Sequence, residues 1–411
     1  MTTRDACMEM DRNDPLAFAR SRFSLPDGML YLDGNSLGAL PIGTAARIAD
    51  AVAREWGHDL IQSWNKADWI GLPLRVAKRL APLIGAGEDE VIAADSTSVN
   101  LFKLASAGLK YQAARRVILT EIENFPTDQY VLQGLAALLG SAVELKAVPR
   151  EALLASLNDS VALLALTHID YKTGAVHDMA AITAAARKVG ALTLWDLSHS
   201  AGAVELALDD CGADLAIGCS YKYLNGGPGG PAYLFVARHL QDKLTQPLSG
   251  WMGHAAPFDF SPHYRPARGM LRFLSGTPVV LGMIAFEEGL KTFDGVSMRD
   301  VQAKAESLGD LFIALVESEC ADAGFVVASP REGSRRGGEV SLRHADGYAI
   351  MQALIAERVI GDFRAPDFMR FGFAPLYTRY VDVFDAVAKL ADIVRSGRWR
   401  EERFKVRAAV T

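Results

Sequence analysis

The sequence predicts an α/β protein in which a mostly parallel central sheet is wrapped by helices and followed by a smaller α+β domain. Between about residues 90 and 236, short apolar runs alternate with amphipathic segments. Several of these runs lack polar alternation, which is typical of strands covered on both faces. After residue 277 the pattern changes to long helices and short strands, and 411 residues exceed the usual limit of one core. We therefore expect two domains.

Seven apolar runs should form the strands of the large domain: 91–94, 117–120, 143–145, 161–166, 192–195, 215–218 and 232–236. Helical patterns between them predict helices over 98–109, 127–139 and 179–189. This alternation is typical of a largely parallel sheet. In the second domain we expect helices over 298–320, 348–357 and 380–394, with strands around Val326, Val340 and Met369. The predicted division is 1–60 for an N-terminal segment that packs with the small domain, 61–277 for the large domain and 278–411 for the small one.

Composition argues against several classes of partner. The net charge of -6 gives no general attraction to nucleic acid or to anionic lipid. The N-terminus has no apolar signal region, and no apolar stretch is long enough to span a bilayer, so we expect a cytoplasmic protein. The four cysteines show neither paired metal spacing nor the density of a disulfide scaffold, which predicts reduced thiols and no metal site.

Lys222 and Asp196 carry the strongest indication of chemistry. Asp196 ends one apolar run, and Lys222 lies between another run and a glycine-rich turn. A lysine amine can form a Schiff base with the aldehyde of pyridoxal phosphate, and a carboxylate can keep the pyridine nitrogen of that cofactor protonated. Alone, each residue is better explained as a helix cap or a solvated lysine. Together, at strand ends that meet on one rim of the sheet, they favour the cofactor.

Other residues on the same rim have weaker indications. Ser96, Thr97 and Ser98 stand where a strand meets a helix, and they could hold a phosphate or simply cap the helix. His199 follows Asp196 by three residues but could be structural. Tyr221 reaches the cofactor only if the strand before it has ended; otherwise it belongs to the core.

Candidates for substrate contacts lie further away in the sequence. Arg370 is flanked by aromatic residues on a predicted strand, where a buried guanidinium needs an anion. That anion could be a substrate carboxylate or an internal Asp or Glu, and the residues alone favour neither. Trp64 and Trp251 lie among loop-like residues and could stack on a ring, although packing in the core is the default.

At this point the chain resembles the kynureninase family of pyridoxal phosphate enzymes, which share the aspartate-aminotransferase-like fold type I. The resemblance covers nearly the whole chain. It lies in the runs Tyr31-Leu32-Asp33-Gly34-Asn35-Ser36-Leu37-Gly38, Asn124-Phe125-Pro126-Thr127-Asp128, Asp196 to His199, Ser220-Tyr221-Lys222-Tyr223-Leu224-Asn225 and Met369-Arg370-Phe371-Gly372. The lysine run and the Tyr31 to Gly38 run together are specific, whereas the pattern from Asp196 to Lys222 is shared with many relatives.

The resemblance implies hydrolysis of L-kynurenine to anthranilate and L-alanine by a homodimer with shared sites. Lys222 would hold the cofactor and move the substrate α-proton, and Tyr221 would move protons at the β-carbon and the carbonyl. The implied cofactor contacts are Ser96, Thr97, Phe125, Asp128, Thr167, Asp196, His199, Tyr221, Trp251 and Thr277. The implied substrate contacts are Arg370, Asn35, Ser36 and Trp64. Trp64 offers bulk without a hydrogen-bond acceptor, which favours unsubstituted kynurenine over its 3-hydroxy form.

Two alternatives remain at this stage. A cysteine desulfurase or selenocysteine lyase would share the fold, but that chemistry needs a thiol on a mobile loop. Cys211 and Cys219 fall in the predicted sheet region and Cys320 ends a predicted long helix. A regulatory protein that kept the fold without catalysis is the other alternative, and the retention of Lys222, Asp196 and Arg370 argues against it.

Overall fold

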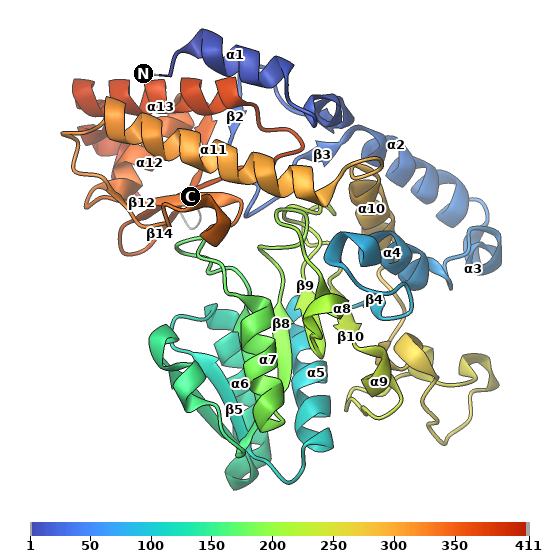
Figure 1. Cartoon of the computed structure of the whole chain (residues 1–411). Coiled ribbons are helices and arrows are strands. Elements are labelled where there is room, and N and C mark those ends of the chain that lie inside the picture. Colours follow the sequence, from blue (N-terminus) through green and yellow to red (C-terminus); the bar gives the residue numbers. More distant parts are fainter. Residues whose placement is uncertain (1, 408–411) are drawn as a thin grey trace.

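A seven-stranded sheet forms the centre of the lower lobe in Figure 1. The structure is a computed structural model that describes residues 2–407. The strand order is β4-β10-β9-β8-β7-β5-β6, and β10 runs antiparallel to both of its neighbours while the other described strands run parallel to one another. The strands are β4 (Val91–Ala93), β5 (Val117–Glu121), β6 (Glu144–Val148), β7 (Val161–Thr167), β8 (Leu192–Asp196), β9 (Leu215–Gly218) and β10 (Tyr233–Val236). The predicted fold class and all seven predicted strands are confirmed.

Helices cover the faces of this sheet, as the apolar strands require. Every residue of β4, β5, β8, β9 and β10 is buried. Helix α5 packs against β7, β8, β9 and β10, and α7 packs against β8. The helices of this lobe are α4 (Leu72–Leu80), α5 (Thr97–Tyr111), α6 (Pro126–Leu139), α7 (Met179–Val189), α8 (Leu208–Cys211), α9 (Arg238–Gln241) and α10 (Val280–Lys291).

The upper lobe contains an antiparallel sheet of order β11-β12-β15-β14, covered by long helices (Figure 1). The rings of Phe312 and Phe371 lie 4.7 Å apart where α11 meets β15. The strands are β11 (Val326–Val327), β12 (Glu339–Arg343), β14 (Asp362–Arg364) and β15 (Phe368–Gly372). The helices are α11 (Met298–Glu319), α12 (Gly347–Ala356) and α13 (Tyr380–Ser396). The helices and strands predicted for this region are therefore present.

The N-terminal segment connects the two lobes. Helix α1 (Arg4–Arg12) packs on α13, and β2 (Leu30–Tyr31) pairs in parallel with β13 (Val359–Ile360). In the same segment, β1 (Phe23–Ser24) pairs with β3 (Leu40–Pro41). Helix α2 (Ile42–Asp50) then packs on α10, and α3 (Ser63–Lys66) follows.

Two hydrophobic cores correspond to the two lobes. Cys7, Leu30 and Leu32 belong to the smaller core, whereas Phe23 and Ala51 belong to the larger one. Helix α10, although it follows residue 277, contributes to the larger core. The domain boundaries given above therefore remain predictions.

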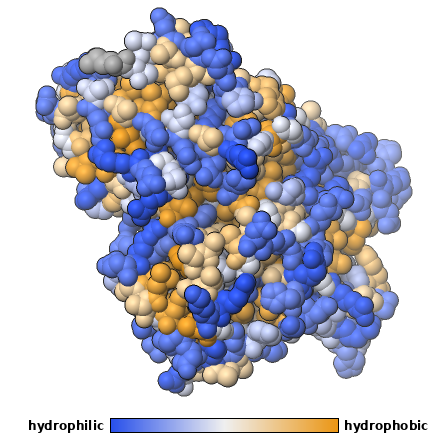
Figure 2. Space-filling view, viewed as in Figure 1, coloured by the Kyte–Doolittle hydropathy of each residue, from blue (hydrophilic) through white to orange (hydrophobic). Residues whose placement is uncertain are grey.

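The face of the molecule seen in Figure 2 is largely hydrophilic, with apolar patches. Figure 2 shows apolar side chains gathered over the part of the lower lobe that carries α6 in Figure 1. Leu138 and Leu139, at the end of that helix, are exposed. Among the described residues, no helix is both long and apolar enough to cross a bilayer.

Candidate active site

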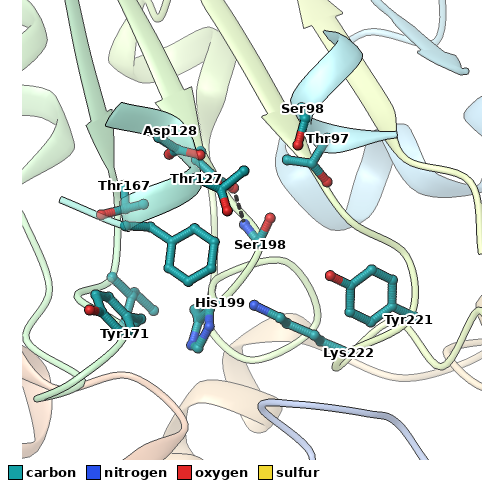
Figure 3. A pocket seen from close by; sticks show the side chains of 13 residues that line it. Thr97, Ser98, Thr127, Asp128, Thr167, Tyr171, Ser198, His199, Tyr221 and Lys222 are labelled. Carbon is teal, nitrogen blue, oxygen red and sulfur yellow. Dashed lines mark hydrogen bonds between the residues drawn. The ribbon is translucent and has the colours of Figure 1, made fainter. Parts of the chain in front are cut away.

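A cavity of about 230 Å³ lies at the carboxyl ends of the parallel strands (Figure 3). This is the edge at which open α/β sheets bind ligands. Its lining comes from Thr97, Ser98, Phe125, Thr127, Asp128, Thr167, Ile169, Tyr171, Asp196, Ser198, His199, Tyr221 and Lys222. The structure thus brings together eight of the predicted site residues: Thr97, Phe125, Asp128, Thr167, Asp196, His199, Tyr221 and Lys222.

A tight turn after β9 presents Lys222. The strand ends at Gly218, so Tyr221 and Lys222 lie beyond it and both side chains reach the cavity. Asn225 adopts a left-handed conformation with φ of 57°, and its N–H donates to the Lys222 carbonyl at 3.0 Å. The Gly38 N–H donates to the Tyr221 carbonyl at 2.7 Å, and a Cβ at Gly38 would lie only 2.4 Å from the Lys222 oxygen. The Tyr31 to Gly38 run therefore packs against the lysine run and holds the turn at Lys222 in place.

Two buried carboxyl groups face the same cavity. Asp196 is the last residue of β8 and accepts a hydrogen bond from the Ser198 N–H at 2.7 Å, while Asp128 lies in the first turn of α6. Burial and the neighbouring Asp196 raise the pKa of Asp128 well above its ordinary value. Burial also raises the pKa of Asp196, against the effects of Ser198 and Lys222. A ring N–H or another cationic donor between these carboxyls would stabilise their ionised forms.

The N-terminus of α5 forms a different wall of the cavity. Ser96 caps this helix by accepting a hydrogen bond from Val99 N–H at 3.4 Å, so it acts as the ordinary N-cap that was one of its two interpretations. Thr97 and Ser98, in the first turn, direct their side chains toward the cavity (Figure 3). The first backbone N–H groups of a helix lack partners within it and favour an anion. This wall is therefore suited to a phosphate.

An aromatic wall stands beside the lysine. The Phe125 and Tyr171 rings meet edge to face, with centroids 5.1 Å apart, and the Lys222 Nζ lies 5.9 Å from the Phe125 centroid. Asn124 holds this wall in place, because its Oδ1 accepts hydrogen bonds from the Phe125 N–H and the Thr167 hydroxyl, both at 2.8 Å. A flat ring could stack on Phe125.

His199 connects the large domain to the small one. Its Nδ1 lies 3.2 Å from the Glu339 Oε2 on β12, and both side chains are buried. Figure 3 shows the Lys222 amine directed toward the His199 ring. Burial, Lys222 and Arg370 lower the pKa of His199 well below its ordinary value, so the imidazole is neutral.

Arg370 lies next to the cavity in a buried polar cluster. Its Nε donates to Asp362 Oδ1 at 2.7 Å, and other guanidinium N–H groups reach the Tyr171 carbonyl and the Ser36 hydroxyl. The internal ion pair was one of the two interpretations of this arginine, and it is present. Because Tyr171 lines the cavity and its carbonyl contacts Arg370, Arg370 and Ser36 adjoin the cavity. Asn35, the residue before Ser36, is buried next to Gly372 and Glu339.

Seven predicted site residues do not line this cavity: Ser96, Asn35, Ser36 and Arg370, which are described above, and Trp64, Trp251 and Thr277. Trp64 and Trp251 contact each other, with ring centroids 6.1 Å apart, and Trp251 also contacts Phe258. Thr277 is exposed. Within a single chain, the structure does not bring these three residues to Lys222.

Some lining residues were missing from the prediction: Thr127, Ile169, Tyr171 and Ser198. Most follow a strand or begin a helix at the carboxyl edge of the sheet, so the same edge argument could have identified them. Glu339 and Asp362 had no such indication, because each lies in a small-domain strand far along the sequence.

Comparison with known proteins assigns the family. A family model described as the kynureninase C-terminal domain matches residues 301–390. The chain is 50% identical over 416 residues to a kynureninase from Burkholderia mallei (strain SAVP1), with full coverage of both chains. It is also 49% identical to a kynureninase from Pseudomonas fluorescens, again over the full length of both. The chain belongs to the kynureninase family.

Solved structures support the fold of this kynureninase-family chain. An apo cysteine desulfurase from Thermococcus onnurineus NA1 aligns with a TM-score of 0.77 and 18% identity over 92% of this chain and 98% of that one. A mutant C-DES, with glycine covalently linked to its PLP cofactor, aligns with a TM-score of 0.79 and 17% identity over 91% of this chain and 99% of that one. At these identities the likeness establishes the fold alone, that of fold type I.

Proposed function

We propose that this kynureninase-family chain uses pyridoxal 5′-phosphate to hydrolyse the Cβ–Cγ bond of L-kynurenine, giving anthranilate and L-alanine. The observation that carries the proposal is the single cavity shared by Lys222, the Asp128 and Asp196 carboxyls and the α5 N-terminus. These groups match the aldehyde, the ring nitrogen and the phosphate of that cofactor. The choice of substrate is supported by sequence identities of 50% and 49% to two kynureninases over their full length.

The residues present fit the cofactor. Lys222 would hold its aldehyde carbon, Asp196 and Asp128 its ring nitrogen, Phe125 one ring face, and Thr97 its phosphate. The paired carboxyls are the most specific part of this match, because burial raises the pKa of both acids despite the nearby Lys222 cation. Ser96, Thr167, His199 and Tyr221 complete the proposed contacts within the chain.

When bound, the protonated cofactor ring withdraws electrons from the substrate α-carbon, which is the chemistry that amino-acid side chains lack. The Lys222 Nζ would accept the proton released from that carbon. Tyr221 would supply a proton at the β-carbon and assist water at the γ-carbonyl. The nearby Cys219, burial and Asp196 raise the pKa of Tyr221, so its phenol stays protonated as a donor.

Arg370 would bind the substrate α-carboxylate, with Ser36 and Asn35 beside it. The ion pair with Asp362 does not exhaust the guanidinium, which carries five N–H groups. A carboxylate would take the remaining N–H and replace the weak Ser36 contact, whose atoms lie 3.4 Å apart. Asp362 would then act as the anchor that orients the arginine.

Trp64, Trp251 and Thr277 would serve the site of a second copy, so we infer a homodimer with shared sites. The segment that carries Trp251 exposes large apolar side chains, including Phe258 at 60% and Phe260 at 77% exposure. Such surface favours an interface. Trp64 in that position would favour unsubstituted kynurenine, because it has no acceptor for a 3-hydroxyl. We also infer a cytoplasmic location, which the four unpaired thiols favour.

The direct test is to record the visible spectrum of the purified protein, add L-kynurenine, and measure anthranilate fluorescence and alanine. A visible cofactor band and equal amounts of the two products are expected. Without that band, the cofactor assignment is wrong; a band without cleavage would reject the substrate. Comparing kcat/KM for kynurenine and 3-hydroxykynurenine tests the role of Trp64, which a strong preference for the hydroxylated substrate would refute.

A further inference from the structure

Glu339 is a buried carboxyl group of the small domain that contacts the active site of the large one. It is the first residue of β12 and only 1% exposed. Its Oε2 lies 3.2 Å from the Nδ1 of His199, which lines the cavity beside Lys222. Burying an ionised carboxyl group costs free energy unless the charge has partners. The burial of Glu339 at this position therefore requires an explanation.

Backbone contacts from both domains hold the segment that carries Glu339. The Gly338 carbonyl accepts hydrogen bonds from the Tyr223 hydroxyl at 3.0 Å and from the Phe373 N–H at 2.7 Å. The Gly337 N–H donates to the Gly174 carbonyl at 2.8 Å. Tyr223 follows the cofactor lysine directly in the sequence, so the segment and the lysine turn are fixed to each other. Glu339 therefore has little freedom to move away from His199.

Burial opposes ionisation of Glu339, and two nearby cations offset part of that cost. Arg370 and Lys222 act on it as cations, whereas Asp362 opposes its ionisation and the Asn35 amide lies beside it. Burial raises the pKa of Glu339 to about 7 despite Arg370 and Lys222. Above that pH the carboxylate can only accept a hydrogen bond, so the neutral His199 must carry its proton on Nδ1. The Nε2 of His199 is then an acceptor.

We propose that Glu339 is a positioning residue: by accepting a hydrogen bond from the Nδ1–H of His199, it fixes the tautomer and the orientation of the ring that lies against the cofactor. It acts through His199 and touches neither substrate nor cofactor. A partner behind an imidazole commonly sets which nitrogen binds and which donates. This inference rests on the proposed binding of pyridoxal phosphate, but the Glu339–His199 contact itself does not.

The chain provides a matched control for this pair. His177 Nε2 lies 3.1 Å from Glu121 Oε2, and both side chains are also buried. Neither residue lines the cavity. Glu121→Gln therefore makes the same chemical change, in a similar pair, away from the proposed cofactor.

The experiment uses full-length protein with ¹⁵N-labelled histidine rings, studied by NMR at pH 8 with and without pyridoxal 5′-phosphate. The eight histidines give few signals, and those of His199 are assigned by their loss in His199→Gln. We expect the Nδ1–H tautomer of His199 in the wild type. In Glu339→Gln, whose amide can either donate or accept, His199 should become a mixture of tautomers. Its affinity for pyridoxal 5′-phosphate should fall about tenfold.

Glu121→Gln should alter the His177 signals and leave those of His199, and the cofactor affinity, as in the wild type. Glu339→Asp keeps the negative charge, but its side chain is one methylene shorter and the carboxylate lies farther from His199. This variant should therefore give the same mixture of tautomers, and it replaces Glu339→Gln in the experiment if the Gln variant does not fold. An unchanged His199 tautomer and cofactor affinity in a folded Glu339 variant would overturn the inference. Failure of the wild type to bind pyridoxal phosphate would instead overturn the proposed function.

Discussion

The guanidinium of Arg370 and the carboxylate of Asp362 face each other across the paired strands β14 and β15, with Nε and Oδ1 2.7 Å apart. Asp362 Oδ2 also accepts a hydrogen bond from the Ser36 hydroxyl at 3.0 Å. Burial opposes ionisation of Asp362, but the hydrogen bond and charge of Arg370 hold its pKa below the ordinary value. The arginine proposed to bind substrate is thus oriented before any substrate arrives.

Asp362→Asn should therefore weaken substrate binding. The side chain keeps its size but loses the charge that orients Arg370, and hydrogen bonds to charged groups contribute about 1.5–3 kcal/mol. We expect KM for kynurenine to rise roughly tenfold with a smaller change in kcat. The reason is that Arg370 would bind the α-carboxylate of the substrate in the ground state and in the transition state alike. Steady-state kinetics measures this. The control is Asp367→Asn, which breaks the exposed pair with Arg343 in the same sheet and should leave KM unchanged; equal KM values for both variants would contradict the anchoring role.

Arg370 also illustrates what sequence can and cannot establish. Its aromatic neighbours predicted a buried strand, and a buried guanidinium requires an anion, but two anions were equally suitable. The partner lies on a separate short strand, and only the pairing of β14 with β15 brings it opposite the arginine. No local pattern encodes that contact.

The large-domain half of the site was easier to predict for a physical reason. Parallel strands all end at one edge, so Asp196 and Lys222 had to meet once the strands were recognised. Glu339 could not be found in this way, since it enters from the other domain. Trp251 and Thr277 show a different limit: the family resemblance assigned them to the site, yet in the single chain they lie outside the Lys222 cavity.

Replacing the lysine tests the cofactor assignment. Lys222→Ala should abolish covalent retention of the cofactor after borohydride reduction, because no amine remains to bond the aldehyde. Turnover should fall roughly 10³-fold or more. Mass spectrometry of the reduced protein measures the first effect. Lys188→Ala, on the exposed face of α7, is the control and should retain the adduct; an adduct persisting in Lys222→Ala would place the cofactor on another lysine.

Tyr221→Phe separates proton transfer from cofactor binding. Loss of the phenol should lower kcat by roughly 10²–10⁴-fold, the usual contribution of a positioned acid or base. The visible band of the bound cofactor should stay the same, because Lys222 and Asp196 remain. Stopped-flow absorbance and steady-state turnover measure the two effects, and Tyr130→Phe on the exposed face of α6 serves as the control. Wild-type turnover in Tyr221→Phe would reject this role.

Asp33 should make stability depend on pH. Burial and the nearby Asp362 raise its pKa in the folded protein to about 7, against an ordinary value of 3.8. Between these values the folded state binds more protons than the unfolded state, so this group's contribution to stability is greatest below pH 4 and is lost as pH rises to 7. Asp33→Asn removes that dependence. As pH rises from 4.5 to 8, the unfolding free energy of Asp33→Asn should increase by roughly 2–4 kcal/mol relative to that of the wild type. Urea denaturation at each pH measures this difference. If the unfolding free energies of the two proteins change in parallel with pH, Asp33 does not titrate in this way.

Mixing inactive variants tests whether two copies share each site. If Trp251 serves the partner's cavity, a mixed dimer of Lys222→Ala and Trp251→Ala contains one site with both defects and one with neither. Unfolding and refolding the two variants together should then restore about a quarter of wild-type activity, because half of the random dimers are mixed. Lys222→Ala mixed with Tyr221→Phe is the control, since both residues line the cavity of one chain and every mixed dimer keeps two defective sites. Recovery in the first mixture alone would assign Trp251 to the partner's site. Equal activity in both mixtures would mean that each chain completes its own site, leaving the contact between Trp64 and Trp251 a structural one.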